Sequence, residues 1–251
     1  MNQRMAIVLA AGKGTRMESE LPKVLAPACG RPLIEFVLDT LDEAGFEKVI
    51  VVVGYRADEV RRALAHRPNL TFVEQTQQLG TGHAVKVCRE ELVDHDGPVL
   101  IVTGDSPMLQ VRSVNTLLER FAEERPACIL GTLHKEQPQG LGRIVRDEQG
   151  EFQGIVEEKD ATPEQKAITE VNMSTYVFNC RDLVYALDRL KNENAQKEYY
   201  ITDCPGILKA AGKKILALPV LQPCEALSVN NLAELRIVEE AMRKMGVPCG
   251  S

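Results

Sequence analysis

The chain has 251 residues, of which 44% are hydrophobic and 26% charged, and its formal net charge at pH 7 is −6. This length fits one large α/β domain or two small ones. The negative charge argues against broad nucleic-acid binding, which needs a basic face. No apolar run reaches the roughly 20 residues of a membrane helix. We therefore expect a globular protein whose partners are small molecules, with neither nucleic acid nor membrane among them.

Seven cysteines are scattered along the chain without a C-x-x-C pair. An odd, dispersed set of this kind predicts reduced thiols, and it predicts neither a disulfide framework nor a zinc site. The first apolar run begins at Met5, with no signal-peptide pattern before it. These features predict a cytoplasmic protein and leave its oligomeric state open.

The first half of the chain alternates β-branched runs with helical patterns. Met5–Leu9 and Lys48–Val53 are nearly continuous apolar runs, typical of strands buried on both faces of a parallel sheet. Between them, apolar residues from Leu33 to Leu41 recur at helical spacing, and Gly45 follows as a helix cap. Together these segments predict a βαβ unit.

The same alternation continues to about residue 133. The further segments expected are strands at Leu70–Val73, Val99–Val102 and Ala127–Leu133 and helices at Ala84–Val93 and Val111–Glu124. Such alternation favours a doubly wound, mostly parallel open sheet of the α/β, Rossmann-like class. Ligands of such sheets bind beyond the carboxyl ends of the strands.

The second half changes character. A hairpin-like pair of extended segments surrounds Asp147–Gly150, and shorter strands and helices follow. The expected segments are strands at Gly142–Arg146, Gln153–Glu158, Val171–Phe178 and Lys214–Pro219 and helices at Asp182–Leu190, Pro205–Ala211 and Asn231–Met245. We expect one compact domain over residues 1–251 with two lobes, divided at about residue 135, and a C-terminal helix and tail over residues 230–251.

A glycine-rich segment, LAAGKGTRM, follows the first strand directly. Small residues there let backbone N–H groups approach an anion, and Lys13, Arg16 and Lys23 add positive charge. The segment matches neither the G-x-x-x-x-G-K-[ST] phosphate loop nor the G-x-G-x-x-G dinucleotide motif, which disfavours an ATPase or a dehydrogenase. The G-x-G alone is equally compatible with an ordinary turn carrying solvated lysines.

A second loop, QTQQLGTGHA, runs from Gln75 to Ala84. The Gln75 amide offers a donor and an acceptor, which suits the hydrogen-bonding edge of a pyrimidine. The alternative is a polar loop in which Thr81 caps the next helix. We expect His83 to be structural.

Asp105 follows Gly104 at the end of a predicted buried strand, which is a usual place for a metal-binding carboxylate. Mg²⁺ needs few protein ligands, because it keeps several waters and shares substrate phosphates. Asn230 could supply a second oxygen, although on its own it fits a helix cap as well.

Eight pieces of the sequence, in order, resemble the uridylyltransferase half of the bifunctional N-acetylglucosamine-1-phosphate uridylyltransferase/glucosamine-1-phosphate acetyltransferase family, within the sugar nucleotidyltransferases. The EYYITD string at Glu198–Asp203 and the VEEKDA string at Val156–Ala161 narrow the match to that half. Asn194–Gln196 belongs to the same piece as the EYYITD string, and the other pieces are Leu9–Met17 with Leu21–Lys23, Gln75–Ala84, Gly104–Asp105, Gly142–Arg146, Asn172 and Val229–Asn231.

The resemblance implies transfer of a uridylyl group from UTP to N-acetylglucosamine 1-phosphate with Mg²⁺, releasing pyrophosphate. It implies that Arg16, Lys23 and Asp105 are catalytic and that Asp105 and Asn230 hold the metal. The implied nucleotide contacts are Leu9, Ala10, Ala11, Gly12, Lys23, Gln75, Gly80, Thr81, Thr103, Gly104 and Asp105. The implied sugar contacts are Gly142, Glu157, Asn172 and Asn230, which makes residues 1–135 mainly a nucleotide lobe and 136–229 mainly a smaller sugar lobe.

Three departures from the family accompany the match. Met173-Ser174 stands where Thr-Gly is typical, and Leu141 stands where an aromatic residue is usual. The family's left-handed β-helix has no counterpart in this sequence, so no acetyl transfer is expected. The alternatives are a related transferase with another sugar or nucleotide, such as CTP, or a non-catalytic nucleotide-sugar-binding domain.

Overall fold

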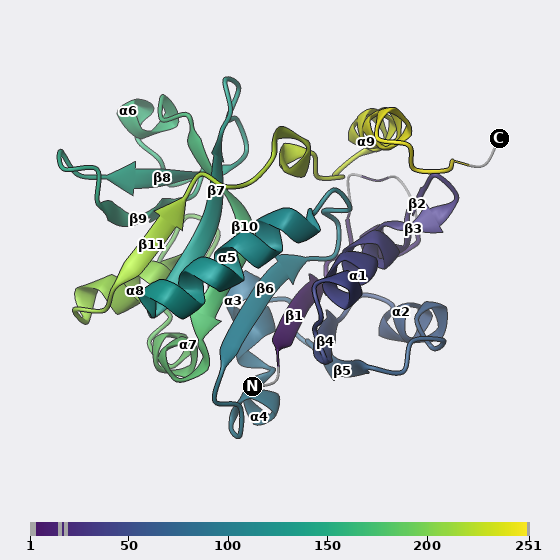
Figure 1. Cartoon of the computed structure of the whole chain (residues 1–251), viewed down its shortest axis with the longest axis horizontal. Helices are drawn as coiled ribbons and strands as arrows, with labels where there is room; N and C mark the ends of the chain where they lie inside the picture. The colour runs from purple at the N-terminus through teal and green to yellow at the C-terminus, as the bar shows by residue number, and fades with distance from the viewer. Residues whose placement is uncertain (1–3, 15–16, 18–19, 250–251) are drawn as a thin grey trace.

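The computed structural model describes residues 4–14, 17 and 20–249. Within this part of the chain, nine strands form one sheet in the order β11-β7-β10-β6-β1-β4-β5, with β8 beside β10 and β9 beside β8. The strands are β1 (Met5–Ala10), β4 (Lys48–Val53), β5 (Leu70–Glu74), β6 (Pro98–Thr103), β7 (Cys128–His134), β8 (Gly142–Arg146), β9 (Phe152–Val156), β10 (Glu170–Asn179) and β11 (Ile215–Leu218). Figure 1 shows β8 and β9 extending away from the body of the sheet.

The sheet has a parallel half around β1 and a half in which most pairs are antiparallel, with β11 parallel to β7 at its edge. Strand β1 pairs in parallel with β4 and β6, and β4 pairs in parallel with β5. Strand β10 is antiparallel to β6, β7 and β8, and β8 is antiparallel to β9. The predicted doubly wound, mostly parallel sheet is confirmed, and its antiparallel part lies in the second half of the chain.

Helices cover both faces, because alternate residues of each buried strand point in opposite directions. In β1, Ala6 and Val8 share an apolar cluster with one set of helices, and Met5 and Ile7 share a cluster with another. The first set is α1 (Leu33–Glu43), α2 (Ala57–Ala63) and α5 (Val111–Glu124). The second set is α3 (Thr81–Lys86), α4 (Arg89–Leu92), α7 (Cys180–Leu187) and α8 (Asp203–Ala210).

Most predicted elements are present, and a few differ. The helix expected over Ala84–Val93 is two short helices, because the chain tightens at Cys88, whose N–H donates to the carbonyl of Val85 at 3.0 Å. Three further features were not predicted, namely α2, α6 (Pro163–Lys166) and the small hairpin of β2 (Pro27–Ala28) and β3 (Arg31–Pro32). Gly45 has φ +74° just beyond α1, as a helix cap requires.

The C-terminal helix α9 (Leu232–Lys244) lies beside β2 and β3, which come from the opposite end of the chain (Figure 1). The Cys29 N–H donates to Glu239 at 2.9 Å, and a disulfide joins Cys29 to Cys249. The prediction of reduced thiols is therefore wrong for this pair. A separation of 220 residues carries no local sign of pairing, and only the fold brings the tail to the hairpin.

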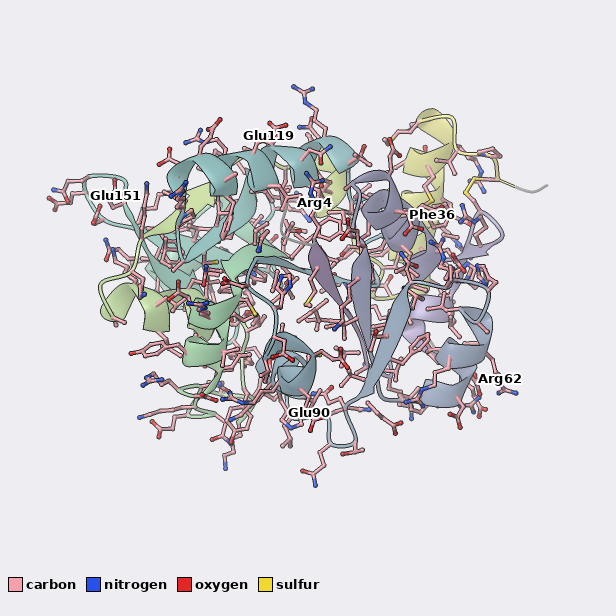
Figure 2. The ribbon with its side chains drawn as sticks, turned by 60° about the horizontal axis from the view of Figure 1, so that its bottom comes forward. Arg4, Phe36, Arg62, Glu90, Glu119 and Glu151 are labelled. Atoms are coloured by element: carbon pink, nitrogen blue, oxygen red, sulfur yellow. A yellow bond between two sulfur atoms is a disulfide. The ribbon has the colours of Figure 1, made fainter. Side chains whose placement is uncertain are left out.

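Charged side chains project from the helices into solvent, as Figure 2 shows for Arg62 of α2, Glu90 of α4 and Glu119 of α5. Within residues 4–14, 17 and 20–249, none of the helices has the length and apolar character that a bilayer crossing requires.

Candidate active site

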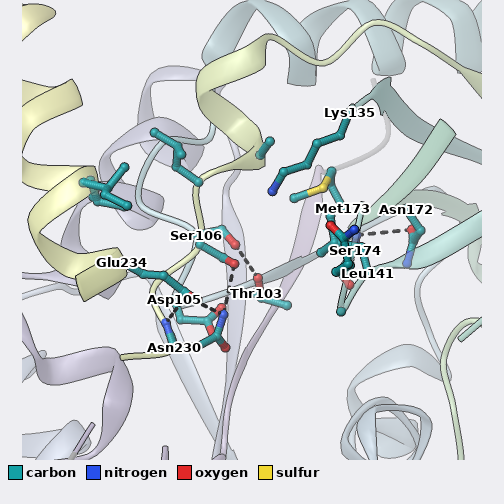
Figure 3. Close-up of a pocket in the computed structure, with 17 residues that line it drawn as sticks. Thr103, Asp105, Ser106, Lys135, Leu141, Asn172, Met173, Ser174, Asn230 and Glu234 are labelled. Carbon is teal, nitrogen blue, oxygen red and sulfur yellow. Dashed lines mark hydrogen bonds between the residues drawn. The ribbon is translucent and has the colours of Figure 1, made fainter. Parts of the chain in front are cut away.

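Two cavities open at the carboxyl ends of the parallel strands, and Asp105 lines both. The first, of about 350 Å³, lies at the end of β1 and is lined by Leu9, Ala10, Gly12, Lys13, Gly14, Lys23, Val24 and Asp105. The second, of about 440 Å³, includes Thr103, Asp105, Asn172 and Asn230 in its lining (Figure 3). Two ligands held in these cavities would meet at Asp105.

A polar cluster marks this meeting point. The Lys23 ammonium forms an ion pair with the Asp105 carboxylate and donates to the Asn230 side-chain oxygen at 2.7 Å. The Lys23 and Asp105 side chains are only 14% and 21% exposed. The structure thus brings together three predicted site residues from three distant parts of the sequence.

Gly14 fixes the position of Lys23. Gly14 has φ +67°, and a Cβ built there would lie 2.5 Å from the Lys23 Cβ. A larger residue would displace the lysine, so glycine serves both the turn and the close approach. Arg16, predicted to contact the phosphates, lies outside the described residues.

Asn230 is held in one orientation. Its side-chain nitrogen donates to Glu234 at 2.9 Å, and its backbone N–H donates to the same carboxylate at 2.8 Å. The amide oxygen is thereby turned toward Lys23. The helix cap proposed as an alternative for Asn230 is instead Asn231, whose side chain accepts from the Glu234 N–H at 2.9 Å.

The remaining first-lobe residues lie around the first cavity and on the next loop. The backbone N–H of Gly104 donates to the Leu9 carbonyl at 2.9 Å, and the N–H of Tyr55 donates to the Ala11 carbonyl at 3.0 Å. The Thr103 hydroxyl shares a 2.8 Å hydrogen bond with that of Ser106. Thr103 and Gly104 therefore carry the chain from β6 to Asp105.

Gln75 supports the second loop from inside the protein. Its side chain is 3% exposed, and its amide nitrogen donates to the Gly80 carbonyl at 3.0 Å and lies 3.1 Å from His83 Nδ1. Burial, the largest cause, lowers the pKa of His83. A role for Gln75 in base recognition stays a prediction, because the structure shows this amide engaged with its own loop.

The 198–203 segment joins the Gln75–Ala84 loop to the second lobe. The Tyr199 N–H donates to the Leu79 carbonyl at 2.8 Å, and the Gly82 N–H donates to the Tyr199 carbonyl at 2.7 Å. The Thr81 hydroxyl accepts from the Ile201 N–H at 3.1 Å, so it does not cap α3 as the alternative proposed. Gly80, with φ +107°, lies so close to Tyr199 that a Cβ would be 2.6 Å from its carbonyl.

Gly142, Glu157 and Asn172, predicted to contact a sugar, are neighbours. A Cβ built on Gly142 would lie 3.6 Å from Asn172 Cβ and 3.6 Å from Glu157 Oε1. Burial raises the pKa of the Glu157 carboxyl, and a 2.9 Å hydrogen bond from the Thr202 hydroxyl opposes that rise. The 198–203 segment therefore contacts both the loop at Gly80 and the carboxylate at Glu157.

Met173 and Ser174 occupy an irregularity of β10. The pairing of β10 with β7 shifts register between Asn172 and Tyr176, and Ser174 has φ +54°. Its N–H donates to the Asn172 side-chain oxygen at 3.2 Å. Met173 is 9% exposed, packs in the apolar cluster that includes Leu133, and lines the second cavity.

The oxygens of Asp105 and Asn230 fit a hard divalent cation. Both already contact one positive group, the Lys23 ammonium. Among the described residues, no three His, Cys, Asp or Glu side chains gather as a metal site. One carboxylate and one amide oxygen suit an ion that completes its coordination with water and substrate phosphates.

Comparison with known proteins identifies the family to which this chain belongs. The model of the MobA-like NTP transferase domain matches residues 6–201. The chain belongs to this family. It is 41% identical over 244 residues to the bifunctional protein GlmU of Shouchella clausii and 43% identical over 243 residues to that of Lactococcus lactis, covering 97% and 96% of this chain. It spans 53% and 52% of those proteins, about half their length.

Among solved structures, the chain is similar to UDP-glucose pyrophosphorylase complexed with UDP-glucose. The TM-score is 0.77 at 18% identity, covering 97% of this chain and 99% of that one. At this identity the likeness shows the nucleotidyltransferase fold alone.

Three residues of the site were not predicted. Glu234 orients Asn230, Thr202 contacts Glu157, and Lys135 lines the second cavity. The spacing of Asn231 and Glu234, three residues apart at a helix start, is a capping signal that could have drawn attention to Glu234. Thr202 lies in the EYYITD string, but nothing in that string predicts its contact with Glu157, and Lys135 carries no comparable local signal.

Proposed function

We propose that this chain transfers a uridylyl group from UTP to a sugar 1-phosphate, N-acetylglucosamine 1-phosphate or a related compound, with Mg²⁺ as the divalent cation. The observation that supports this most is the meeting of two cavities at Asp105. The glycine-rich loop and Lys23 line the first, which suits the nucleotide. Asn172 and Asn230 line the second, which suits the sugar 1-phosphate.

In the proposed reaction, a sugar-phosphate oxygen attacks the α-phosphorus of UTP. The new P–O bond forms as the bond to the β-phosphate oxygen breaks, and pyrophosphate leaves with that electron pair. Charge accumulates on the phosphate oxygens, so the protein mainly positions the reactants and neutralises charge. A phosphate monoester is already nucleophilic near pH 7, and no strong general base is required.

Within this scheme, Lys23 neutralises charge on the reacting phosphates, and Asp105 and Asn230 would hold the metal. The bound cation would supply further positive charge at the phosphates. Glu234 keeps the Asn230 oxygen turned toward this point. Asn172 would contact the sugar in the second cavity. Gly142 and Glu157 do not line that cavity and lie beside Asn172, so their proposed contact with the sugar rests on the family resemblance.

The deciding experiment measures pyrophosphate release with UTP, CTP, dTTP and ATP against several sugar 1-phosphates. We expect turnover with UTP and an N-acetylhexosamine or hexose 1-phosphate, in the presence of Mg²⁺. Turnover with CTP alone would instead assign a cytidylyltransferase. Nucleotide-sugar binding without turnover for any pair would show a non-catalytic binding domain.

The predicted cytoplasmic location stays a prediction. Substrates such as UTP favour it, whereas the Cys29–Cys249 disulfide weighs against it, because disulfides are rare in reducing compartments.

A further inference from the structure

The Lys23 ammonium lies between the two side chains that would hold the divalent cation. It forms an ion pair with Asp105 and donates to the Asn230 side-chain oxygen at 2.7 Å. Figure 3 shows Asp105 and Asn230 together at the edge of the second cavity. The lysine side chain is 14% exposed, so it meets these oxygens away from bulk water. A cationic group of the protein itself thus occupies the place proposed for the metal.

The ammonium and a metal ion cannot share these oxygens without strong repulsion. Mg²⁺ lies about 2.1 Å from each oxygen that coordinates it. An ion on the Asn230 oxygen would therefore lie within about 5 Å of an ammonium bonded to the same oxygen. Like charges at this distance, partly shielded from water, repel each other more than they do in bulk solvent. Lys23 and the cation therefore compete for one place.

The two oxygens keep their positions when the ammonium moves. Glu234 fixes the Asn230 amide, because it accepts from the side chain at 2.9 Å and from the backbone N–H at 2.8 Å. The Val229 N–H donates to the Asp105 carbonyl at 3.2 Å, which joins the two segments through their main chains. The pair of ligands therefore does not depend on Lys23.

The Lys23 side chain also has a second partner within reach. Its main chain is fixed, because the Ala26 N–H donates to the Lys23 carbonyl at 3.0 Å and Gly14 lies against the Lys23 Cβ. The flexible four-carbon stem can still turn the ammonium. Lys23 lines the first cavity, where the phosphates of the nucleotide would lie. The same ammonium can therefore serve either the metal ligands or the phosphates.

We propose that Lys23 takes the place of the divalent cation while the nucleotide is absent, and leaves it for the phosphates when the nucleotide binds. The inference rests on the proposed nucleotidyl transfer and adds an order to it. Without phosphates, an ammonium that left Asp105 would lose its ion pair inside the protein. With phosphates, it exchanges one anionic partner for another. The cation therefore binds with the nucleotide or after it, and binds weakly to the nucleotide-free enzyme.

The test measures Mn²⁺ binding without nucleotide, from the loss of the electron paramagnetic resonance signal of free Mn²⁺. Mn²⁺ is suited by the same oxygen ligands as Mg²⁺. We expect Lys23→Met to bind Mn²⁺ about 10-fold more tightly than the parent, the scale of a hydrogen bond between charged groups.

Two control variants assign this gain to the proposed place. Lys13→Met removes an exposed lysine of the first cavity whose ammonium lies 5.3 Å from the centre of the Tyr55 ring. Because salt screens an exposed charge, the Mn²⁺ affinity should change by less than about 3-fold. Adding Asp105→Asn to Lys23→Met should abolish the gain, since it removes the carboxylate for which the two cations compete.

A second measurement needs no variant. Acetic anhydride acetylates accessible lysines, and mass spectrometry locates the modified residues. In the nucleotide-free parent, Lys23 should react slowly, and saturating Mn²⁺ should make it react faster, because the displaced ammonium has lost its partners. Lys13 should react at the same rate with and without Mn²⁺.

Three results would overturn the inference. These are a Lys23→Met variant that binds Mn²⁺ no more tightly than the parent, an equal gain in Lys13→Met, and acetylation of Lys23 that Mn²⁺ leaves unchanged. Pyrophosphate release is measured separately with natural UTP. Its absence with every sugar 1-phosphate would overturn the proposed function, while Mn²⁺ binding and acetylation still decide whether Lys23 competes with the cation.

Discussion

The parallel and antiparallel halves of the sheet build their parts of the site in different ways. In the parallel half, Leu9–Gly12 and Asp105 follow directly from the ends of β1 and β6, so strand geometry alone brings them together. In the antiparallel half, Glu157 depends on Thr202, 45 residues further along the chain. The first half therefore gains its site from topology, and the second gains it from particular long-range contacts.

This difference predicts which substitutions lower the catalytic rate and which alter the binding of the sugar 1-phosphate. In the parallel half a single side chain should affect catalysis with all acceptors. In the antiparallel half the effects should depend on the acceptor or on pH.

The largest effect is expected at Lys23. Lys23→Ala should lower kcat by on the order of 10²-fold or more, because it removes one preorganised charge from the reacting phosphates. Single-turnover pyrophosphate release would measure it. Lys48→Ala, which removes a lysine at the opposite end of the parallel strands, serves as the control. Near-parental turnover of Lys23→Ala would exclude this lysine from the mechanism.

The next effect concerns the metal. Asp105→Asn and Asn230→Ala should each raise the Mg²⁺ concentration needed for half-maximal activity by roughly 10-fold or more, the scale of weakening a metal site. Asn69→Ala is the matched control, because it removes an asparagine whose side chain hydrogen-bonds Asp42 at 3.0 Å, away from the cluster. If the first two variants keep the parental Mg²⁺ titration, the assignment of these ligands is wrong.

A smaller, pH-dependent effect is expected at Thr202. The Thr202 hydroxyl bonds the charged form of Glu157 and so lowers its pKa, which burial raises. Thr202→Val should raise that pKa further. If the charged Glu157 carboxylate binds the sugar, then as the pH is lowered, kcat/KM for the sugar 1-phosphate should begin to fall at a higher pH in the variant than in the parent. Below that pH the loss should reach about 10-fold.

Thr202→Ser keeps the hydroxyl and should restore the parental pH profile. Glu157→Gln cannot titrate and should lose this acid limb. The positioning role of Thr202 would be contradicted by a valine variant that is weaker by the same factor at every pH.

The smallest effect is expected at Ser174. Its φ of +54° is unfavourable for a residue with a Cβ, so Ser174→Gly should increase the free energy of unfolding by about 1 kcal/mol, measured by urea denaturation. Ser174→Ala, which keeps the Cβ, should give no such gain. An unchanged or reduced stability of the glycine variant would show that the extra conformational entropy of glycine in the unfolded chain outweighs the backbone preference.

The effect of Met173 and Ser174 on the preference among sugar 1-phosphates can be measured in the same way. We predict that the parent accepts N-acetylglucosamine 1-phosphate but prefers it over glucose 1-phosphate by less than about 200-fold in kcat/KM, the range of steric discrimination, and that Met173→Thr/Ser174→Gly changes this preference. If the parent already prefers the N-acetylated compound by several orders of magnitude and the double variant matches it, the departure from Thr-Gly is neutral.

The same contrast explains what the sequence could predict. The strands at Met5–Ala10 and Lys48–Val53 and the loop after β1 follow from hydrophobic runs and glycine spacing, which are local properties. The grouping of Gly142, Glu157 and Asn172 at one site came only with the family resemblance, and the contact between Lys23 and Asn230 was not predicted. Thr202 and the disulfide were missed, because each depends on contacts between segments whose sequences carry no sign of one another.

The bond between Cys29 and Cys249 also determines how the molecule would respond to mechanical force. Tension applied to the two ends of the chain would run through β1 and η2 (Lys23–Leu25) to Cys29 and cross directly into the tail. The segment between the two cysteines would bear no load while the bond is intact. Tension between Met5 and Cys249 would therefore act first on β1 and the glycine-rich loop that follows it.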